Sequence, residues 1–186
     1  MEKTDDVLDY RNDLEQTHSI EFQKTNQSIL VREFAVKQFL AVELNEDREK
    51  DYVFIDRNDK KNKVEFKNYI HHKNSNVICL EVYHDVATQF FGWTFRLIQN
   101  EVNYVVFVWQ GKAKLCYLIL HGSLLEHWWR ENWQKYEMPL NRPTHNHKRG
   151  LNWRSSFCRV PIKDLPTSII YKRKRFADLF DFIGGN

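Results

Sequence analysis

The sequence predicts a mixed α/β fold, with a central sheet flanked by helices. Runs of residues with strand-like alternation or continuous apolar character recur along the chain, and segments with helical spacing of apolar residues separate them. Hydrophobic residues make up 42% of the 186 residues and aromatic residues 15%. That content excludes a disordered chain and is enough for a sizeable core. We therefore expect a single domain over residues 1–186.

The expected order is helix, three strands, helix, two strands and helix. These elements are placed at 29–44, 51–57, 63–70, 76–83, 87–99, 103–109, 114–120 and 123–133, and a short strand at 157–160 and a helix at 174–183 follow. The first two strands are joined by a polar segment, 58–62, which is typical of a hairpin loop. Three adjacent strands and a crossover helix indicate a mixed sheet.

The helices and the most apolar strand carry local signals. Ser28 can cap the first helix, and Ser123 with Glu126 forms a capping box for the third. Gly92 weakens the middle helix. The strand at 103–109 is continuously apolar at its centre, as expected for a strand that is buried on both faces.

The net charge is only +3, but the charges are unevenly distributed. Residues 1–21 hold seven acids and two bases, whereas residues 141–175 hold ten Lys or Arg and one acid. A basic segment with aromatic residues suits a nucleic-acid backbone, although a solvated basic face is an equally good interpretation. The residues expected to contact DNA are Arg142, Lys148, Arg149, Arg154 and Arg159.

The three cysteines, Cys79, Cys116 and Cys158, are far apart and form no CxxC motif. They favour neither a zinc ribbon nor a disulfide framework, so a reducing, cytoplasmic setting is expected. No apolar run approaches the roughly 20 residues of a membrane helix, and the acidic start does not resemble a signal peptide. We expect no membrane partner.

Acidic residues and a lysine gather on the first two predicted strands. Asp51 begins one strand, and Glu65 and Lys67 lie on one face of the next, because they are two residues apart. Magnesium prefers oxygen ligands, and a bound Mg²⁺ polarises a phosphoryl group. A lysine beside it can orient or deprotonate the attacking water and offset charge in the transition state. The pattern indicates metal-dependent hydrolysis of phosphodiesters.

Asp51, thirteen intervening residues and then Glu65-Phe66-Lys67 resemble the motif of the PD-(D/E)XK nuclease superfamily, although Lys50 stands where the motif has proline. The resemblance covers about residues 28–120 and implies a restriction-endonuclease-like core. It implies that Asp51 and Glu65 bind Mg²⁺ and that Lys67 positions the water.

Three further acids are candidates for the same site. Asp56 competes with Asp51 for the first position, but it lies near the hairpin loop, so we prefer Asp51. Glu81 lies in an apolar strand, where a carboxylate is costly unless it is paired or metal-bound. It is the third expected catalytic and metal-binding acid, with a salt bridge to Lys67 as the alternative. Glu33 is a further candidate, although a solvated i,i+4 pair with Lys37 is the favoured interpretation.

Each of these features also has a purely structural interpretation. Glu65 and Lys67 also suit a charged ladder on an edge strand. Gly92 and Trp93 either turn the chain beside the site or kink a packed helix, and we favour packing. The Trp-rich helix at 123–133 suits a partner surface, but a core helix is the better expectation.

The expected function is magnesium-dependent cleavage of double-stranded DNA. The chain is also similar to the small, cleavage-only subunits of heterodimeric type IIS restriction endonucleases, which implies a larger DNA-recognising partner. The alternatives are a non-catalytic nucleic-acid-binding protein that keeps the nuclease fold and a protein-interaction module with an incidental basic face. Only the last predicts no salt-dependent affinity for DNA. We expect Glu65→Ala to abolish cleavage and to leave folding largely intact.

Overall fold

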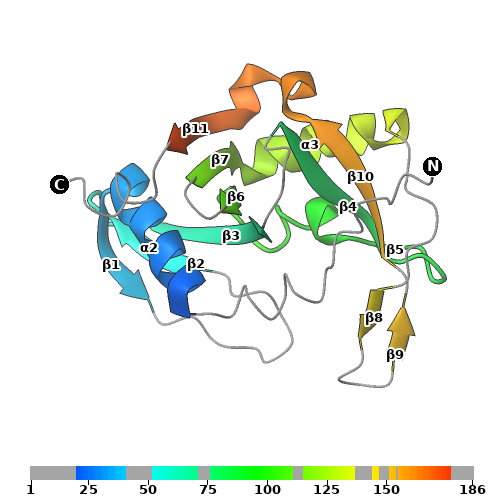
Figure 1. Cartoon of the computed structure of the whole chain (residues 1–186), viewed down its shortest axis with the longest axis horizontal. Helices are drawn as coiled ribbons and strands as arrows, with labels where there is room; N and C mark the ends of the chain where they lie inside the picture. The colour runs from blue at the N-terminus through cyan, green and yellow to red at the C-terminus, as the bar shows by residue number, and fades with distance from the viewer. Residues whose placement is uncertain are drawn as a thin grey trace, which may run out of the picture.

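The computed structural model describes residues 20–40, 52–70, 76–110, 115–136, 144–146, 151–153 and 155–176. Its largest element is a six-stranded sheet in the order β1-β2-β3-β6-β7-β11 (Figure 1). The strands are β1 (Val36–Leu40), β2 (Tyr52–Asp56), β3 (Lys61–Ile70), β6 (Tyr104–Gln110), β7 (Leu115–His121) and β11 (Ile170–Phe176). Neighbouring strands are antiparallel except for β3 and β6, which are parallel, so the expected mixed sheet is confirmed.

A second sheet has three strands in the order β10-β4-β5. Its strands are β4 (Val77–Asp85), β5 (Phe90–Phe91) and β10 (Ser156–Pro161), and a separate pair is formed by β8 (Thr144–Asn146) and β9 (Leu151–Trp153). The helices are α2 (Ile20–Phe34) and α3 (Gly122–Asn132), with short 3₁₀ turns η1 (Trp93–Phe95), η2 (Trp133–Lys135), η4 (Ile162–Asp164) and η5 (Thr167–Ile169). The described part of the chain is therefore mixed α/β with more strand than helix.

The two faces of the large sheet belong to two separate cores. On one face α2 packs Ile29 and Leu30 against apolar residues of β2, β3, β6 and β7. On the other face lie the second sheet and α3, with Trp129 fully buried among them. Figure 1 shows α2 at the left of the molecule, across β2, and α3, β4 and β10 at the upper right.

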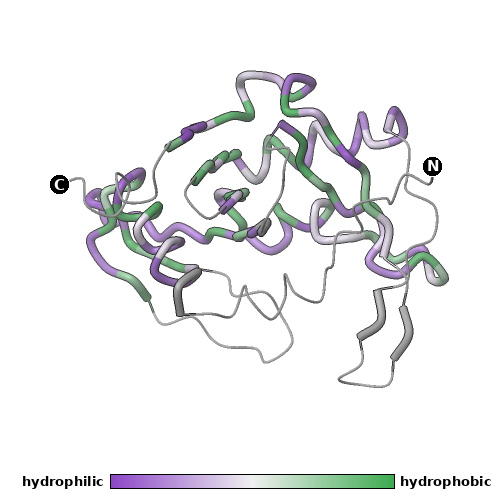
Figure 2. Tube along the Cα trace, in the orientation of Figure 1, coloured by the Kyte–Doolittle hydropathy of each residue, from purple (hydrophilic) through white to green (hydrophobic). Residues whose placement is uncertain are grey.

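The most apolar strand, β6, lies where the sequence places it. Val105 and Phe107 face one core and Val106 and Val108 face the other. Figure 2 shows hydrophobic colouring along β6 and β7, two interior strands of the sheet. The expectation of burial on both faces is confirmed, because sheets covered on both sides require apolar residues in consecutive positions.

The first helix was predicted wrongly at both ends. It begins at Ile20, so Ser28 lies inside it, where its hydroxyl donates to the carbonyl of Lys24 at 2.8 Å instead of capping the helix. It ends at Phe34 rather than continuing to residue 44. Ala35 has φ 47°, a left-handed conformation that ends a helix, and the chain continues as β1 against β2. The expected pair between Glu33 and Lys37 does not form, since Lys37 contacts Asp59 instead. Strand pairing with β2 has overridden the local helical pattern.

The expected helix at 87–99 is also wrong. The segment is a turn followed by β5 and η1. The backbone N–H of Gly92 donates to the carbonyl of Val82 at 2.9 Å, and Phe91 pairs with Tyr83, so the segment is hydrogen-bonded to β4. The connection from β3 to the parallel β6 runs through β4, β5 and η1 instead of a crossover helix.

Two further expectations concern the later helices. The helix expected at 123–133 is present as α3, but Ser123 makes no capping hydrogen bond, because the helix begins at Gly122 with His121 at the N-cap. The helix expected at 174–183 is wrong in its described part, since Lys174 lies in β11 and pairs with Tyr117 of β7. Residues 177–183 lie outside the described residues. The expected strands at 76–83, 114–120 and 157–160 correspond to β4, β7 and β10.

The three cysteines are free thiols. Neither helix in the described part of the chain has the length and apolar character needed to cross a bilayer.

Candidate active site

Glu65 and Lys67 lie on the same face of β3. Their strand partners on β6 are Val105 and Phe107, which belong to the core that contains α3 and the second sheet. Both charged side chains are buried, with residue exposures of 8% for Glu65 and 9% for Lys67. The interpretation of an exposed charge ladder on an edge strand is wrong, because β3 lies inside the sheet between β2 and β6.

The two side chains form an ion pair. Lys67 Nζ lies 2.7 Å from Glu65 Oε1, and it also lies 4.4 Å from the ring centroid of Trp93, which places the ammonium group against an aromatic surface. Burial lowers the pKa of Lys67 to about 7, and the negative charge of Glu81 opposes this shift. Lys67 is therefore a buried amine that lies against an acid and an indole ring, with burial favouring its neutral form.

Glu81 reaches the same place from the second sheet. Its strand, β4, pairs with β10 and β5 and not with β3, so the expectation of acids on adjacent strands is wrong in this respect. Its residue exposure is 4%. The backbone N–H of Trp93 donates to Glu81 Oε2 at 2.8 Å, and His84 Nδ1 lies 3.4 Å from Oε1. The packing of one sheet on the other brings Glu81 close enough for its charge to act on Lys67.

Gly92 permits this arrangement by its lack of a side chain. A Cβ at this position would lie 2.4 Å from Cγ of Glu81, closer than real atoms approach. The backbone of Gly92 is in the ordinary extended region, with φ −72° and ψ 179°, so the glycine supplies space rather than an unusual conformation. The close approach lets the following residue, Trp93, direct its N–H at the carboxylate.

The sequence left Trp93 with two interpretations, and the structure places it beside the site. It has no kinked helix to stabilise, and it contacts both Lys67 and Glu81. His84 was not singled out from the sequence. Its spacing of three residues from Glu81 is a signal only once the register shift between Tyr83 and Asp85 is known, since residues three apart on a regular strand point to opposite faces.

Asp51, the preferred first acid, lies outside the described residues. The strand that follows it, β2, begins at Tyr52, which is paired with Val64, the residue before Glu65. The chain therefore enters β2 beside the Glu65 end of the hairpin.

Asp56 lies at the other end of β2. Its carboxylate accepts hydrogen bonds from the backbone N–H groups of Asn58 and Lys60, at 2.9 and 3.0 Å, and from the Asn62 side chain at 3.2 Å. Burial acts to raise its pKa, but these hydrogen bonds hold the pKa of Asp56 below its usual range. The register places Asp56 at the hairpin loop, at the far end of β2 from Tyr52 and Val64. This is the position for which we preferred Asp51 over Asp56 as the first acid.

Glu33 lies on the opposite face of the large sheet from Glu65. Its carboxylate accepts a hydrogen bond from the hydroxyl of Tyr117, which belongs to the core under α2. The ammonium groups of Lys172 and Lys174 on β11 lie 3.8 and 3.7 Å from it. The sheet separates this acid from Glu65 and Lys67, so the structure does not bring it into the cluster.

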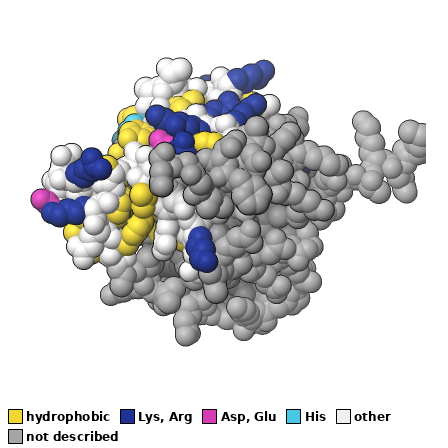
Figure 3. All heavy atoms as spheres, turned by 60° about the vertical axis from the view of Figure 1, so that its left-hand side comes forward, with side chains coloured by type: hydrophobic (Ala, Val, Ile, Leu, Met, Phe, Trp, Pro, Cys, Tyr) yellow, Lys and Arg dark blue, Asp and Glu magenta, His cyan; other side chains and the backbone are white. Residues whose placement is uncertain are grey.

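The basic segment is described only in part. Of the five residues expected to contact DNA, Arg142, Lys148, Arg149 and Arg154 lie outside the described residues, and Arg159 is exposed on β10. Four consecutive bases lie on β11: Lys172, Arg173, Lys174 and Arg175. Figure 3, which brings the side of α2 and β1 forward, shows Lys and Arg side chains on this face.

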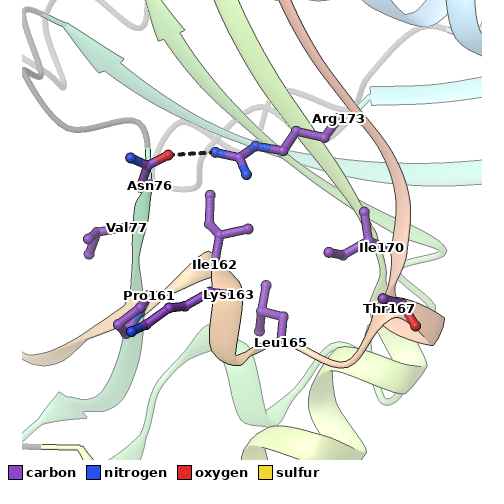
Figure 4. A pocket seen from close by; sticks show the side chains of 9 residues that line it. All are labelled: Asn76, Val77, Pro161, Ile162, Lys163, Leu165, Thr167, Ile170 and Arg173. Atoms are coloured by element: carbon purple, nitrogen blue, oxygen red, sulfur yellow. Dashed lines mark hydrogen bonds between the residues drawn. The ribbon is translucent and has the colours of Figure 1, made fainter.

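A cavity of about 480 Å³ lies elsewhere, between the beginning of β4, the turns η4 and η5, and β11. Figure 4 shows apolar side chains around it, with Arg173 hydrogen-bonded to Asn76 across one side. Neither Glu65, Lys67 nor Glu81 lines this cavity. The cavity is therefore separate from the candidate site.

The described part of the site contains two acids and one lysine. Within the described ranges no group of three or more His, Cys, Asp or Glu could hold a metal ion, and Asp51 is not among the residues described. Two carboxylates beside a lysine are nevertheless the donor types that suit an oxygen-preferring cation and a phosphate. Comparison of the chain with family models, curated proteins and solved structures finds no match.

Proposed function

We propose that the chain is a magnesium-dependent DNA endonuclease that hydrolyses phosphodiester bonds at Glu65, Lys67 and Glu81. The observation that carries the proposal is the burial of these three charged side chains at one place, between two sheets. Burial of charged groups is costly, so structural packing alone would favour apolar residues here. Asp51 completes the acidic set by its place in the sequence, one residue before β2.

The acids suit a magnesium ion by their chemistry. Asp51, Glu65 and Glu81 would hold it, because Mg²⁺ takes carboxylate oxygens and keeps several waters. The ion would polarise the scissile phosphate and lower the pKa of a water molecule.

Lys67, Glu65 and Trp93 have separate roles in the proposed reaction. Lys67 would position the attacking water and offset negative charge at the phosphate, and Glu65 fixes the lysine through the 2.7 Å ion pair. Trp93 covers Lys67 on one side and holds Glu81 by its backbone N–H. The proposal includes a restriction-endonuclease-like core, with the parallel pairing of β3 and β6 in its favour. The described part of the connection from β3 to β6, residues 76–103, holds no crossover helix, which is a departure from that pattern.

Substrate binding is assigned to the basic residues of 141–175 and to double-stranded DNA, since phosphate contacts position a duplex without reading its sequence. We also propose that a larger protein subunit supplies site recognition, in the manner of the heterodimeric type IIS enzymes. The Trp-rich helix no longer favours this part of the proposal. In α3 Leu125 and Trp129 are fully buried, so the helix belongs to the core.

The test is cleavage of supercoiled plasmid with Mg²⁺, by the protein alone and with lysate of the source cell. Glu65→Gln is the better inactive variant, because the amide keeps the size of the side chain and an oxygen that can accept a hydrogen bond from Lys67, whereas Glu65→Ala would remove both and would confound activity with folding. Glu131→Ala, an exposed glutamate on α3, is the matched control. We expect cleavage by the wild type and by Glu131→Ala, and a loss of at least about a hundredfold in Glu65→Gln.

Cleavage only in the presence of lysate would assign the chain the role of a catalytic subunit, whereas cleavage by the protein alone would remove the need for a partner. Equal plasmid cleavage by wild type and Glu65→Gln would refute the assignment of the site.

One observation favours a second candidate function. Glu65 and Lys67 already form a buried ion pair, as expected of a nuclease fold that is kept as a non-catalytic nucleic-acid-binding protein. This candidate predicts salt-dependent DNA affinity without Mg²⁺-dependent cleavage under any of the conditions above.

A further inference from the structure

Two phenylalanines are exposed beside the proposed site. Phe90 and Phe91 form β5, and 50% and 44% of their surface is exposed. Figure 1 places β5 at the right-hand edge of the molecule, next to the end of β4, and Figure 2 shows hydrophobic colouring on this projecting segment. Two adjacent, half-exposed aromatic rings on a projecting hairpin are costly to leave in water without a binding partner.

The rings are held in place on the protein side. Tyr83 stacks on Phe91 with ring centroids 5.5 Å apart and an interplanar angle of 19°. Phe95 packs against Phe91 with ring centroids 4.6 Å apart. The ring of His84 lies edge-on to that of Phe90, with ring centroids 6.3 Å apart. Because neighbouring aromatic side chains fix the rings, little side-chain entropy would be lost when a flat ligand stacks on them.

This aromatic surface adjoins Glu81. His84, which contacts Phe90, also approaches Glu81 Oε1 at 3.4 Å. Phe91 is followed directly by Gly92, whose missing side chain leaves room for Glu81. A nucleotide whose phosphate lies at Glu81 would therefore have its neighbouring base near β5.

A positive charge accompanies the rings. The guanidinium carbon of Arg96 lies 4.9 Å from the ring centroid of Phe90. An arginine against an aromatic ring combines attraction for a phosphate with a flat stacking surface, and this combination recurs where single-stranded nucleic acid is bound.

We propose that Phe90 and Phe91 stack on unpaired nucleobases of the DNA, so that the substrate has a single-stranded segment next to the scissile phosphate. This inference rests on the proposed function, because it takes Glu81 to lie at the scissile phosphate. Paired bases are stacked on their neighbours inside a duplex, so an aromatic side chain reaches their faces only after they are unstacked. Unpaired bases offer their faces at no such cost.

The experiment measures binding apart from cleavage. Fluorescence anisotropy in Ca²⁺ would compare a labelled oligo-dT of 20 nucleotides with a blunt duplex of 20 base pairs. The proteins are full-length wild type, Phe90→Ala, Phe91→Ala, Phe90→Leu and the control Leu124→Ala, which removes an apolar residue of similar exposure from α3. Circular dichroism and thermal melting would establish that each variant is folded.

We expect each Phe→Ala variant to bind oligo-dT about 5-fold to 100-fold more weakly, in line with the loss of one stacked base. Phe90→Leu, which is apolar but lacks a flat ring, should lose nearly as much. Leu124→Ala should bind as wild type does, and the duplex affinity of all variants should stay within about twofold.

Unchanged oligo-dT affinity in both Phe→Ala variants would overturn the inference, as would equal losses for single strand and duplex or wild-type affinity in Phe90→Leu. A change in self-association instead of DNA affinity, measured by sedimentation, would assign the surface to a protein partner and would also overturn it. Absence of Mg²⁺-dependent cleavage both with and without lysate, in preparations that bind oligo-dT through β5, would refute the proposed nuclease function and leave the stacking surface standing.

Discussion

The close approach of Gly92 to Glu81 makes a substitution at this glycine informative. In Gly92→Ala the new Cβ would lie 2.4 Å from Cγ, 2.6 Å from Oε2 and 2.7 Å from Cδ of Glu81. Because φ is −72° at this position, alanine adopts the backbone conformation without strain. Any loss of stability must therefore come from the lack of space.

The size of the loss follows from what Glu81 can do in response. The side chain is buried, and its Oε2 accepts the N–H of Trp93 at 2.8 Å. If the carboxylate moves, the loss of this hydrogen bond to a charged group costs about 1.5–3 kcal/mol. If the backbone moves instead, overpacking costs about 1–3 kcal/mol. We expect Gly92→Ala to lower the free energy of unfolding by about 1–3 kcal/mol, with a fall in Tm of about 2–4 °C for each kcal/mol.

Urea denaturation of a double-mutant cycle separates this clash from other effects of the substitution. Glu81→Ala removes all three atoms that the new Cβ would meet, so in that background Gly92→Ala should cost less than about 0.5 kcal/mol. Gly122→Ala is the control, because its Cβ would meet the carbonyl oxygen of Val102 at 2.1 Å. Its cost should be the same with and without Glu81. An equal cost of Gly92→Ala in both backgrounds would show that contact with Glu81 is not the source of the loss.

Two other predictions concern α3 and the thiols. Glu126→Ala should lower the free energy of unfolding by about 1.5–3 kcal/mol in urea denaturation, because the carboxylate accepts hydrogen bonds from the Ile98 N–H at 2.7 Å and from the Arg130 guanidinium at 2.6 Å. Ser123→Ala should change the free energy of unfolding by less than about 0.5 kcal/mol, since no capping bond is lost. Equal losses in the two variants would contradict the role given to Glu126. Burial, with a smaller effect of Cys79, raises the pKa of Cys158 to about 11, so in a disulfide-exchange assay Cys158 should stay unreactive at pH 8 in the folded protein and react faster as pH rises toward 11 and more thiolate forms. Rapid reaction of all three thiols at pH 8 would count against the buried, protonated state.

Elements with one dominant signal were predictable from the sequence. The apolar run of β6 could only be a buried strand, and β7 follows the same pattern. The apolar positions of α3 repeat with helical period, so the helix was found even though its capping bond was misassigned. Glu65 and Lys67 were placed on one face because side chains alternate in a strand, whatever the sheet around it.

Elements that depend on distant partners could not be predicted locally. Residues 36–40 have helical spacing, but β2 offers them backbone hydrogen bonds that a helix continuing past Ala35 would forgo. The segment around Gly92 follows the same rule, since its backbone pairs with β4. Secondary structure in both places is decided by a partner strand, which a sequence window does not contain.

Side-chain alternation was enough to place Glu65 and Lys67 on one face, and the apolar residues around Glu81 were enough to place it in a strand. The meeting of these side chains depends on the fold. Glu81 belongs to a different sheet from Glu65, and it comes near Lys67 because the two sheets pack face to face and Trp93 contacts both charged groups. Strand periodicity fixes which way a side chain points, but the packing of layers fixes what it points at, and that depends on contacts between residues far apart in the chain.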